Sequence, residues 1–190
     1  MFKSMLAVLT VIAAGTASAV TITDVSYAAA QTILSNGTPT AGLNFKVGDS
    51  TTYKLSIASF INGTMTMTVK SVDTNAVVLA QDVNVMGQAQ SCTETLNPNN
   101  GQITDMTCNG QKQDPGDSSQ ITVVDSKEAS VTVPAGTFDT LWVKAHNAKD
   151  NTDIEQWINP KLIPVLGLVK MLAPSQIGQM DVELQSFVKN

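Results

Sequence analysis

The period of the apolar residues is the feature that most restricts how this chain can fold. In residues 64–70, TMTMTVK, every second side chain is apolar and the others are threonine or lysine. The same alternation occurs in TTYKLSIASF, AVVLAQDVNV and QMDVELQSFVK. Turn-forming pairs such as Asn62-Gly63 separate these segments roughly every 8–12 residues, which is typical of antiparallel β proteins. The sequence therefore predicts an all-β domain with a strongly curved antiparallel sheet, as a half-barrel, a barrel or a sandwich.

One stretch near the N-terminus departs from this pattern. Residues 23–37, TDVSYAAAQTILSNG, contain a polar residue that can cap a helix, several helix formers and a glycine near the end. The stretch is compatible with one short N-terminal helix or with an irregular lead-in to the first strand.

The first nineteen residues have the three parts of a secretory signal peptide. Lys3 supplies the positive charge, residues 5–14 are apolar, and Ala17-Ser18-Ala19 is a small-residue cleavage site. The apolar run is too short to cross about 30 Å of hydrocarbon. We therefore expect a signal peptide over 1–19 and a single domain over 20–190, with no further transmembrane segment. The mature protein is expected to be periplasmic or secreted, in a bacterial envelope.

The charge balance excludes some classes of partner. The chain has 16 acidic residues against 11 lysines and no arginine, and its formal net charge is −5. Nucleic-acid-binding proteins need a basic surface, and anionic membrane surfaces attract basic segments. We therefore expect no nucleic acid and no anionic membrane surface among its partners.

The two cysteines are predicted to form a disulfide bond, because exported proteins mature in an oxidising compartment. They lie in two short alternating segments on either side of the turn sequence NPNNG. If Asn97 pairs with Ile103 across this turn, the same antiparallel register places Cys92 directly opposite Cys108. Opposed residues on antiparallel strands are close enough for a disulfide. A redox-active pair is the less favoured alternative, since the chain has no Cys-x-x-Cys motif.

Four motifs in a fixed order carry a resemblance to known proteins. They are FKVGDSTTYKL at 45–55, V-x-V-P-A-G-T-F at 131–138, W-x-x-P at 157–160 and G-L-V-K at 167–170. Together they resemble a broad group of exported bacterial domains of unknown function, over roughly residues 45–188. The resemblance implies an antiparallel sheet that curls around an apolar interior, somewhat like the half-barrel carriers of lipoproteins and lipids. It implies no catalytic residues.

The residues themselves also give little sign of catalysis. His146 is the single histidine, and the chain has no nucleophile elbow, P-loop or dinucleotide-binding motif. The acidic residues around DPGDSS and KDNTD match no defined calcium loop. We therefore expect no enzyme activity, no cofactor and no metal site.

Two hypotheses for the function remain open from the sequence. Methionine is a flexible side chain that suits variable apolar ligands. In the first hypothesis the sheet binds a lipid or a lipidated envelope partner on its concave face, and the lining residues are Met65, Met67, Val69, Leu79 and Val83. In the second these side chains fill a solid core. The protein is then a structural or interaction module that contacts protein or glycan through loops such as 109–119 and 159–166.

Overall fold

The computed structural model describes residues 43–99, 101–115, 121–148 and 151–190. The expected signal peptide and the predicted helix at 23–37 lie outside these residues. In the described ranges, every regular element of secondary structure is a β-strand. They are β1 (Ser50–Ile57), β2 (Ile61–Val72), β3 (Val77–Val85), β4 (Gln88–Leu96), β5 (Ile103–Cys108), β6 (Gln111–Gln113), β7 (Ile121–Val133), β8 (Gly136–Asn147), β9 (Thr152–Ile158), β10 (Leu168–Ser175) and β11 (Gly178–Val188).

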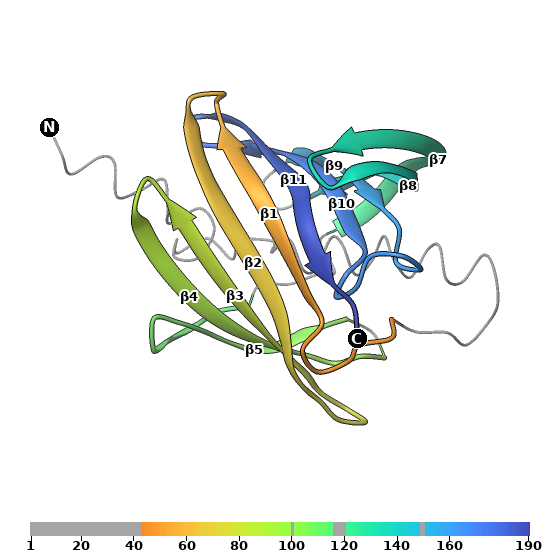
Figure 1. The fold of residues 1–190 in the computed structure, drawn as a ribbon. Helices are drawn as coiled ribbons and strands as arrows, with labels where there is room; N and C mark the ends of the chain where they lie inside the picture. Colours follow the sequence, from red (N-terminus) through yellow and green to blue (C-terminus); the bar gives the residue numbers. More distant parts are fainter. Residues whose placement is uncertain (1–42, 100, 116–120, 149–150) are drawn as a thin grey trace, which may run out of the picture.

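These strands form one open antiparallel sheet, so the all-β, curved-sheet prediction is confirmed. Their order is β6-β5-β4-β3-β2-β1-β11-β10-β9-β8-β7, and β11 pairs with β1 in the middle of the sheet. Figure 1 shows how strongly the sheet curves. The two edge strands, β6 and β7, follow each other in the sequence. The seven residues that connect them can reach at most about 28 Å. The end of β6 and the start of β7 therefore lie at most about 28 Å apart.

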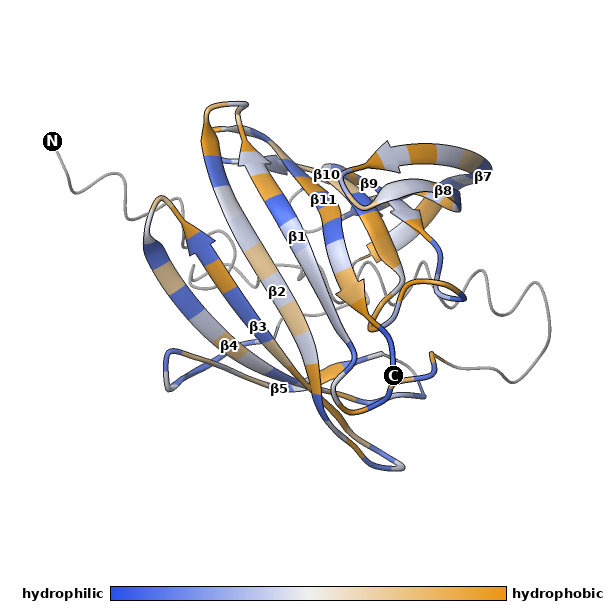
Figure 2. Ribbon diagram, in the orientation of Figure 1, coloured by the Kyte–Doolittle hydropathy of each residue, from blue (hydrophilic) through white to orange (hydrophobic). Residues whose placement is uncertain are grey.

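The alternation along β1 and β2 assigns one face of the sheet to the core. Tyr53 and Leu55 are fully buried, whereas Lys54 between them is exposed. On β2 the methionines are buried, and the threonines between them lie on the opposite face. Figure 2 shows the resulting alternation of apolar and polar residues along the strands. Uncharged polar side chains thus cover much of the outer face, which explains how a chain with few charges can still have a polar surface.

The core extends along the inner face of the sheet, from β4 to β7 in the strand order. Tyr53 lies near its centre, and its hydroxyl donates a hydrogen bond to the carbonyl of Leu168 over 3.2 Å. Complete burial raises the pKa of this phenol far above its usual value, so Tyr53 stays neutral. The largest fully buried side chains are Tyr53, Leu55, Met65, Met67, Leu79, Leu96, Ile158, Ile163, Leu166, Leu168 and Met171.

The β7–β8 hairpin leaves the plane of its neighbours and lies against the middle of the sheet (Figure 1). The amide of Ala135 in its turn donates to the carbonyl of Leu184 on β11 over 3.1 Å. The buried side of β8 changes along the strand: Phe138 and Thr140 are buried near the turn, and Val143 and Ala145 are buried further on. Two-stranded ribbons twist strongly, so the part of β8 beyond its pairing with β9 can turn its other face to the core.

The loop between β9 and β10, residues 159–167, packs apolar side chains into the same core. Ile163, Val165 and Leu166 are all buried there. The amide of Asn159 donates to the carbonyl of Gly167 over 2.7 Å and closes the loop. Gly167 has a φ of 75°, and a Cβ atom at this position would lie 2.6 Å from the Cα of Pro160. Only glycine is compatible with this close approach.

The cysteine hairpin confirms the disulfide and corrects one detail of the predicted register. Cys92 on β4 pairs directly with Cys108 on β5, and the two are bonded, with a Cα–Cα distance of 4.0 Å. Near the turn the register shifts by one residue, so Ile103 lies opposite Leu96 and not opposite Asn97. The side chain of Asn97 instead accepts a hydrogen bond from the amide of Asn99 over 2.9 Å and organises the turn.

Candidate functional site

The predicted ligand-lining residues lie together on the inner face of two neighbouring strands, β2 and β3. The sheet register places Met65 opposite Val83 and Val69 opposite Leu79. Their exposed fractions are 0% for Met65, 1% for Met67, 1% for Val69, 0% for Leu79 and 4% for Val83. All five belong to the apolar cluster that also contains residues of β1, β10 and β11. They are therefore core residues in this structure, and their role in ligand binding stays a prediction.

Buried amides hold two of the core methionines in place. The side-chain amide of Gln81 donates to the sulfur of Met65 over 2.9 Å. Further along the same inner face, between β9 and β10, the side-chain amide of Gln156 donates to the sulfur of Met171 over 3.4 Å. Gln81 is 4% exposed and Gln156 is fully buried. Alternation alone did not single out either glutamine, and both give directional contacts to a side chain that is otherwise adaptable.

The disulfide lies on the same inner face, towards the β6 edge. Cys92 and Cys108 form a second buried cluster with Ile103 and Met106. Glu94, two residues after Cys92 on the same face of β4, is only 1% exposed. The inner face at this edge therefore contains a carboxyl group that the sequence pattern did not predict.

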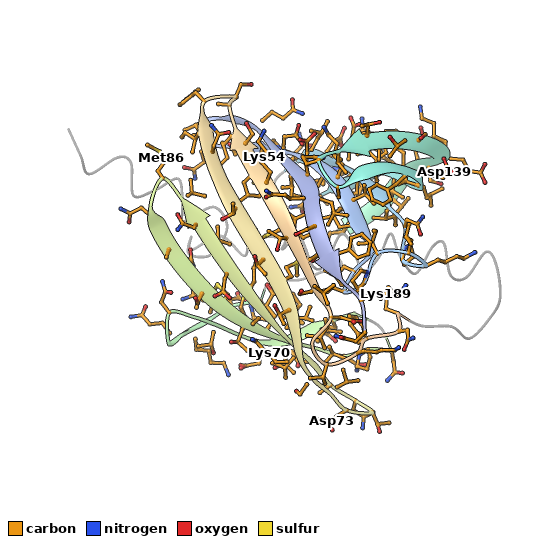
Figure 3. All side chains as sticks on the ribbon, in the orientation of Figure 1. Lys54, Lys70, Asp73, Met86, Asp139 and Lys189 are labelled. Carbon is orange, nitrogen blue, oxygen red and sulfur yellow. A yellow bond between two sulfur atoms is a disulfide. The ribbon has the colours of Figure 1, made fainter. Side chains whose placement is uncertain are left out.

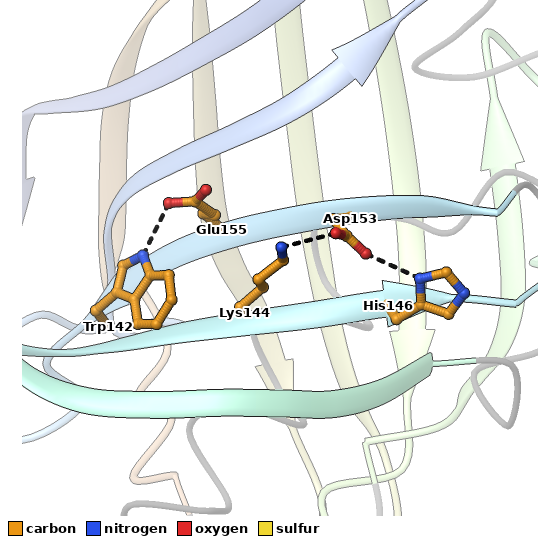
Figure 4. A network of polar contacts seen from close by, with 5 residues as sticks. All are labelled: Trp142, Lys144, His146, Asp153 and Glu155. Carbon is orange, nitrogen blue, oxygen red and sulfur yellow. Dashed lines mark hydrogen bonds and ion pairs between the residues drawn. The ribbon is translucent and has the colours of Figure 1, made fainter.

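A row of polar contacts crosses the outer face of β8 and β9 (Figure 4). The indole of Trp142 donates to Glu155 over 2.9 Å. Asp153 lies 2.8 Å from the ammonium group of Lys144 and, through its other oxygen, 2.8 Å from Nδ1 of His146. The hydrogen bond from Lys144, followed by that from His146, lowers the pKa of Asp153, and the same contact with Asp153 raises the pKa of Lys144. This row includes His146, which the sequence placed on the same strand face as Trp142 and Lys144.

Further polar contacts lie on the neighbouring strands on either side of this row. The ammonium group of Lys127 on β7 lies 4.7 Å from the ring centre of Trp142, a cation–π distance. On β10 and β11, Lys170 is 2.7 Å from Glu183 and 3.1 Å from Asp181. Desolvation acts to lower the pKa of Lys170, but its contacts with these carboxylates outweigh it and raise that pKa. Desolvation raises the pKa of Asp181, and this effect outweighs the lowering by Lys170.

His146 and Asp153 lie side by side, and the second group that contacts Asp153 is the ammonium group of Lys144. Among the residues described, no three or more His, Cys, Asp and Glu side chains lie close enough together to hold a metal ion. The row is best explained as cross-strand pairing on an exposed sheet face.

Two of the open hollows on the surface of the described residues are lined by residues other than the predicted ligand-binding ones. The larger, of about 700 Å³, lies between the β7–β8 hairpin and the loop after β9. Its lining consists of Glu128, Ala129, Ser130, Asp139, Thr140, Leu141, Ile158, Asn159, Pro160 and Lys161. The smaller, of about 420 Å³, adjoins Asp153 and Glu155 and extends to the β10–β11 turn. The loop at 159–166, predicted to contact partners, thus contributes three residues to the larger hollow.

The part of the chain that the structure describes has no helix that is long and apolar enough to cross a membrane.

Comparison with family models and with curated proteins gave no match to this sequence. Comparison with solved structures found weak similarity in overall shape. A candidate exported protein from Bacteroides fragilis with a YmcC-like fold has a TM-score of 0.42 and 12% identity, covering 78% of this chain and 99% of its own. A candidate lipoprotein from Parabacteroides distasonis has a TM-score of 0.41 and 14% identity, covering 79% and 100%. The hypothetical protein CT021 from Chlamydia trachomatis has a TM-score of 0.43 and 8% identity, covering 77% and 89%. All three TM-scores are below 0.5, so this similarity carries no conclusion about function.

Proposed function

We propose that the protein is an exported, non-enzymatic module of the bacterial envelope that makes its contacts through its surface and has a filled core. The observation that carries this proposal is the burial of Met65, Met67, Val69, Leu79 and Val83, which are at most 4% exposed. A sheet whose inner face is already enclosed has its turns, edges and outer face available for a partner. The leader-like residues 1–19 support export.

The second candidate function is the binding of a lipid or a lipidated partner on the inner face. The feature that favours it is the open sheet, since β6 and β7 are both unpaired on one side. A ligand would have to enter between these edges and displace side chains that now contact one another. Such opening would expose several large apolar side chains to water, at a cost of about 1.5–3 kcal/mol for each. The filled module is therefore the better supported function.

A titration with a fluorescent fatty acid separates the two functions. The filled module predicts no saturable binding, and native mass spectrometry of the protein purified after export should give the mature mass without an added ligand. Saturable binding of one fatty acid per chain would favour the carrier function. In that case Leu79→Trp, which enlarges a side chain at the centre of the predicted lining, should abolish the binding. Thr66→Trp on the outer face of β2 is the matched control and should leave either result unchanged.

A further inference from the structure

In the described part of the sheet, β7 is a long edge strand with no partner on its outer side. It has thirteen residues and stands at one end of the strand order, whereas β6 at the other end has only three. Figure 1 shows β7 as the outermost strand of its hairpin. An unpaired strand edge presents a row of amides and carbonyls to which another extended chain can bind. The contacts of β7 determine which part of this edge a further strand can reach.

The middle of β7 carries the free backbone groups. The side chain of Asn159 donates to the carbonyl of Asp139 over 2.8 Å, so this carbonyl points away from β7. Ser130, which lies opposite Asp139, therefore forms a non-hydrogen-bonded pair with it, and the amide and carbonyl of Ser130 point to the outer side of β7. The alternation of an antiparallel ladder gives Glu128 and Thr132 the same direction. Within the described residues, none of these backbone groups has a hydrogen-bond partner.

The protein's own contacts limit this open stretch on both sides. Before it, the amide of Ser126 donates to the carboxylate of Asp125 over 2.8 Å, and a β-bulge lies between Val123 and Asp125. After it, Val133 is only 6% exposed, where the hairpin turn packs against β11. Bulges and charged side chains are devices by which natural sheets block edge pairing. A further strand can therefore add to β7 at residues 128–132, which we call the open edge.

The larger hollow lies directly beside the open edge. The side chains of Glu128, Ser130, Asp139 and Leu141 stand on one face of the hairpin, because Glu128 pairs with Leu141 and Ser130 pairs with Asp139. All four line the hollow of about 700 Å³, and the loop after β9 lines it from the other side. Every second side chain of a strand added to β7 would lie on this same face. Such a strand would therefore have a side chain beside the hollow.

The chemistry of the hollow favours a basic side chain. Glu128 and Asp139 are diagonal neighbours across the hairpin, both are exposed, and neither has an ion-pair partner among the described residues. Lys161 is the single cation among the lining residues, so it balances only one of the two negative charges. The apolar lining residues Leu141 and Ile158 suit the methylene stem of a lysine or an arginine. The formal net charge of −5 also attracts a basic segment.

We infer that the open edge binds an extended polypeptide segment of another envelope protein, which adds a strand to β7 and places a lysine or arginine in the larger hollow. In strand addition, backbone hydrogen bonds supply the affinity and side-chain pockets supply the specificity. This inference rests on the proposed function, since it identifies one surface through which a module with a filled core makes its contacts.

A second copy of this chain fits the open edge less well than a different protein does. Lys127 is the only lysine of β7, and its ammonium group lies over the ring of Trp142. That pair stands on the face of the hairpin opposite to Glu128, its neighbour in the strand. A symmetric pair of β7 strands would therefore bring no cation to the hollow.

Fluorescence anisotropy with two labelled peptides tests the inference in the full protein after export. Both peptides have blocked ends and alternate threonine and valine, and the central residue is arginine in one and glutamate in the other. The natural protein should bind the arginine peptide saturably and about fivefold more tightly than the glutamate peptide, because the carboxylates outnumber the ammonium group in the hollow. Glu128→Gln combined with Asp139→Asn should reduce this preference to within about twofold. Asp73→Asn is the control, since Figure 3 shows Asp73 far from Asp139, and it should leave the preference unchanged.

A proline at the open edge tests the backbone contacts separately. The amide of Ser130 has no bond to β8, so Ser130→Pro should keep the hairpin while it removes a donor to the added strand. Binding of the arginine peptide should weaken at least about tenfold. Ser130→Ala keeps the amide and is the matched control, so it should bind within about twofold of the natural protein. Thermal unfolding of both variants checks that the comparison is made on folded protein.

Four results would overturn the inference. They are no saturable binding of either peptide, equal binding of the two peptides by the natural protein, equal binding by the Ser130→Pro and Ser130→Ala variants, and a dimer of the natural protein that Ser130→Pro dissociates, which would make a second copy the partner. The fatty-acid titration tests the filled core independently. A protein that binds neither the peptides nor the fatty acid would keep the proposed function and lose only this inference.

Discussion

At the scale of single residues, close contacts limit which side chains the sheet accepts. Gly63 is half-buried on β2, where a Cβ atom would lie 2.5 Å from the carbonyl oxygen of Asn84 and 2.7 Å from a methyl group of Val85. Both belong to the neighbouring strand, whose backbone cannot move without disturbing its own pairing. The glycine is therefore required by the approach of β3. The turn predicted at Asn62-Gly63 was wrong, because these residues lie within β2 and the turn is at 58–60.

Gly63→Ala should destabilise the protein by about 1–3 kcal/mol, as overpacking in a well-packed region does. Urea unfolding followed by tryptophan fluorescence measures the change. The next residue provides the control, since Thr64 is exposed and Thr64→Ala should change the free energy of unfolding by less than about 0.5 kcal/mol. Equal stability of the two variants would show that β2 and β3 are further apart than the structure has them.

The contacts of Asp153 predict a pH dependence of stability. Hydrogen bonds from Lys144 and His146 hold its pKa in the folded protein below the usual value of 3.8. A carboxyl group with a lowered pKa stabilises the fold above its unfolded pKa, and this contribution is lost as the pH falls through the folded pKa. Asp153→Asn should therefore lower Tm at pH 7, and the difference from the natural protein should disappear in acid.

Thermal unfolding of both proteins from pH 7 to pH 2 checks this prediction. Asp73→Asn, in an exposed turn at the other end of the sheet, serves as the control and should show no such pH-dependent difference. A difference for Asp153→Asn that grows on acidification would contradict the assigned contacts.

At the scale of single elements, hairpins are the units that the sequence predicts well. The pairing of Cys92 with Cys108 followed from the turn signal and the antiparallel register, and the structure has it. The register at the turn itself was wrong by one residue, because a β-bulge between Thr95 and Leu96 absorbs the difference. Bulges of this kind leave little mark in the alternation of a short segment.

Replacing both cysteines by serine should lower the free energy of unfolding by about 3 kcal/mol, the value expected for a loop of this length. Urea unfolding with and without a reducing agent measures it. The natural protein under reducing conditions should approach the stability of the double variant, and the double variant itself should not respond to the reducing agent. A natural protein that is insensitive to reduction would contradict a stabilising disulfide.

The β7–β8 hairpin shows what alternation does not predict. The pattern places Phe138 on the same face of β8 as Trp142, yet Phe138 is 8% exposed while the polar row occupies that face further along. The twist of the β7–β8 ribbon and its contact with β11 determine that Phe138 is buried, and both depend on residues distant in the sequence. The alternation of apolar residues alone therefore predicts that β8 is a strand, but it does not predict which face is buried at each end of that strand.

Phe138→Ala should cost about 3 kcal/mol or more, because it removes a buried aromatic ring. Its exposed neighbour provides the control, and Asp139→Ala should be close to neutral. Chemical denaturation of the two variants distinguishes a hairpin packed against β11 from one that extends into solvent, for which both substitutions would be mild.

At the scale of the whole molecule, the sequence predicted the sheet but not how its interior is closed. Period and turn spacing were sufficient for an all-β curved sheet, because both are local properties of the chain. The order of the strands, with β11 beside β1, depends on pairing between the two ends of the domain. The burial of the predicted lining residues depends further on the loop after β9 and the β7–β8 hairpin, which contribute Ile163, Leu166 and Phe138 to the same cluster.

The methionines allow a direct measurement of whether the interior is filled. Met86 is 61% exposed, whereas Met65, Met67, Met106, Met171 and Met180 are at most 7% exposed. Hydrogen peroxide oxidises accessible methionine to the sulfoxide and is small enough to enter an open groove. In a time course of peroxide oxidation followed by peptide mass mapping, Met86 should react at nearly its rate in urea-unfolded protein, while Met65 and Met67 are protected at least about tenfold. Oxidation of Met65 and Met67 as fast as Met86, in protein that is still folded, would contradict a filled interior.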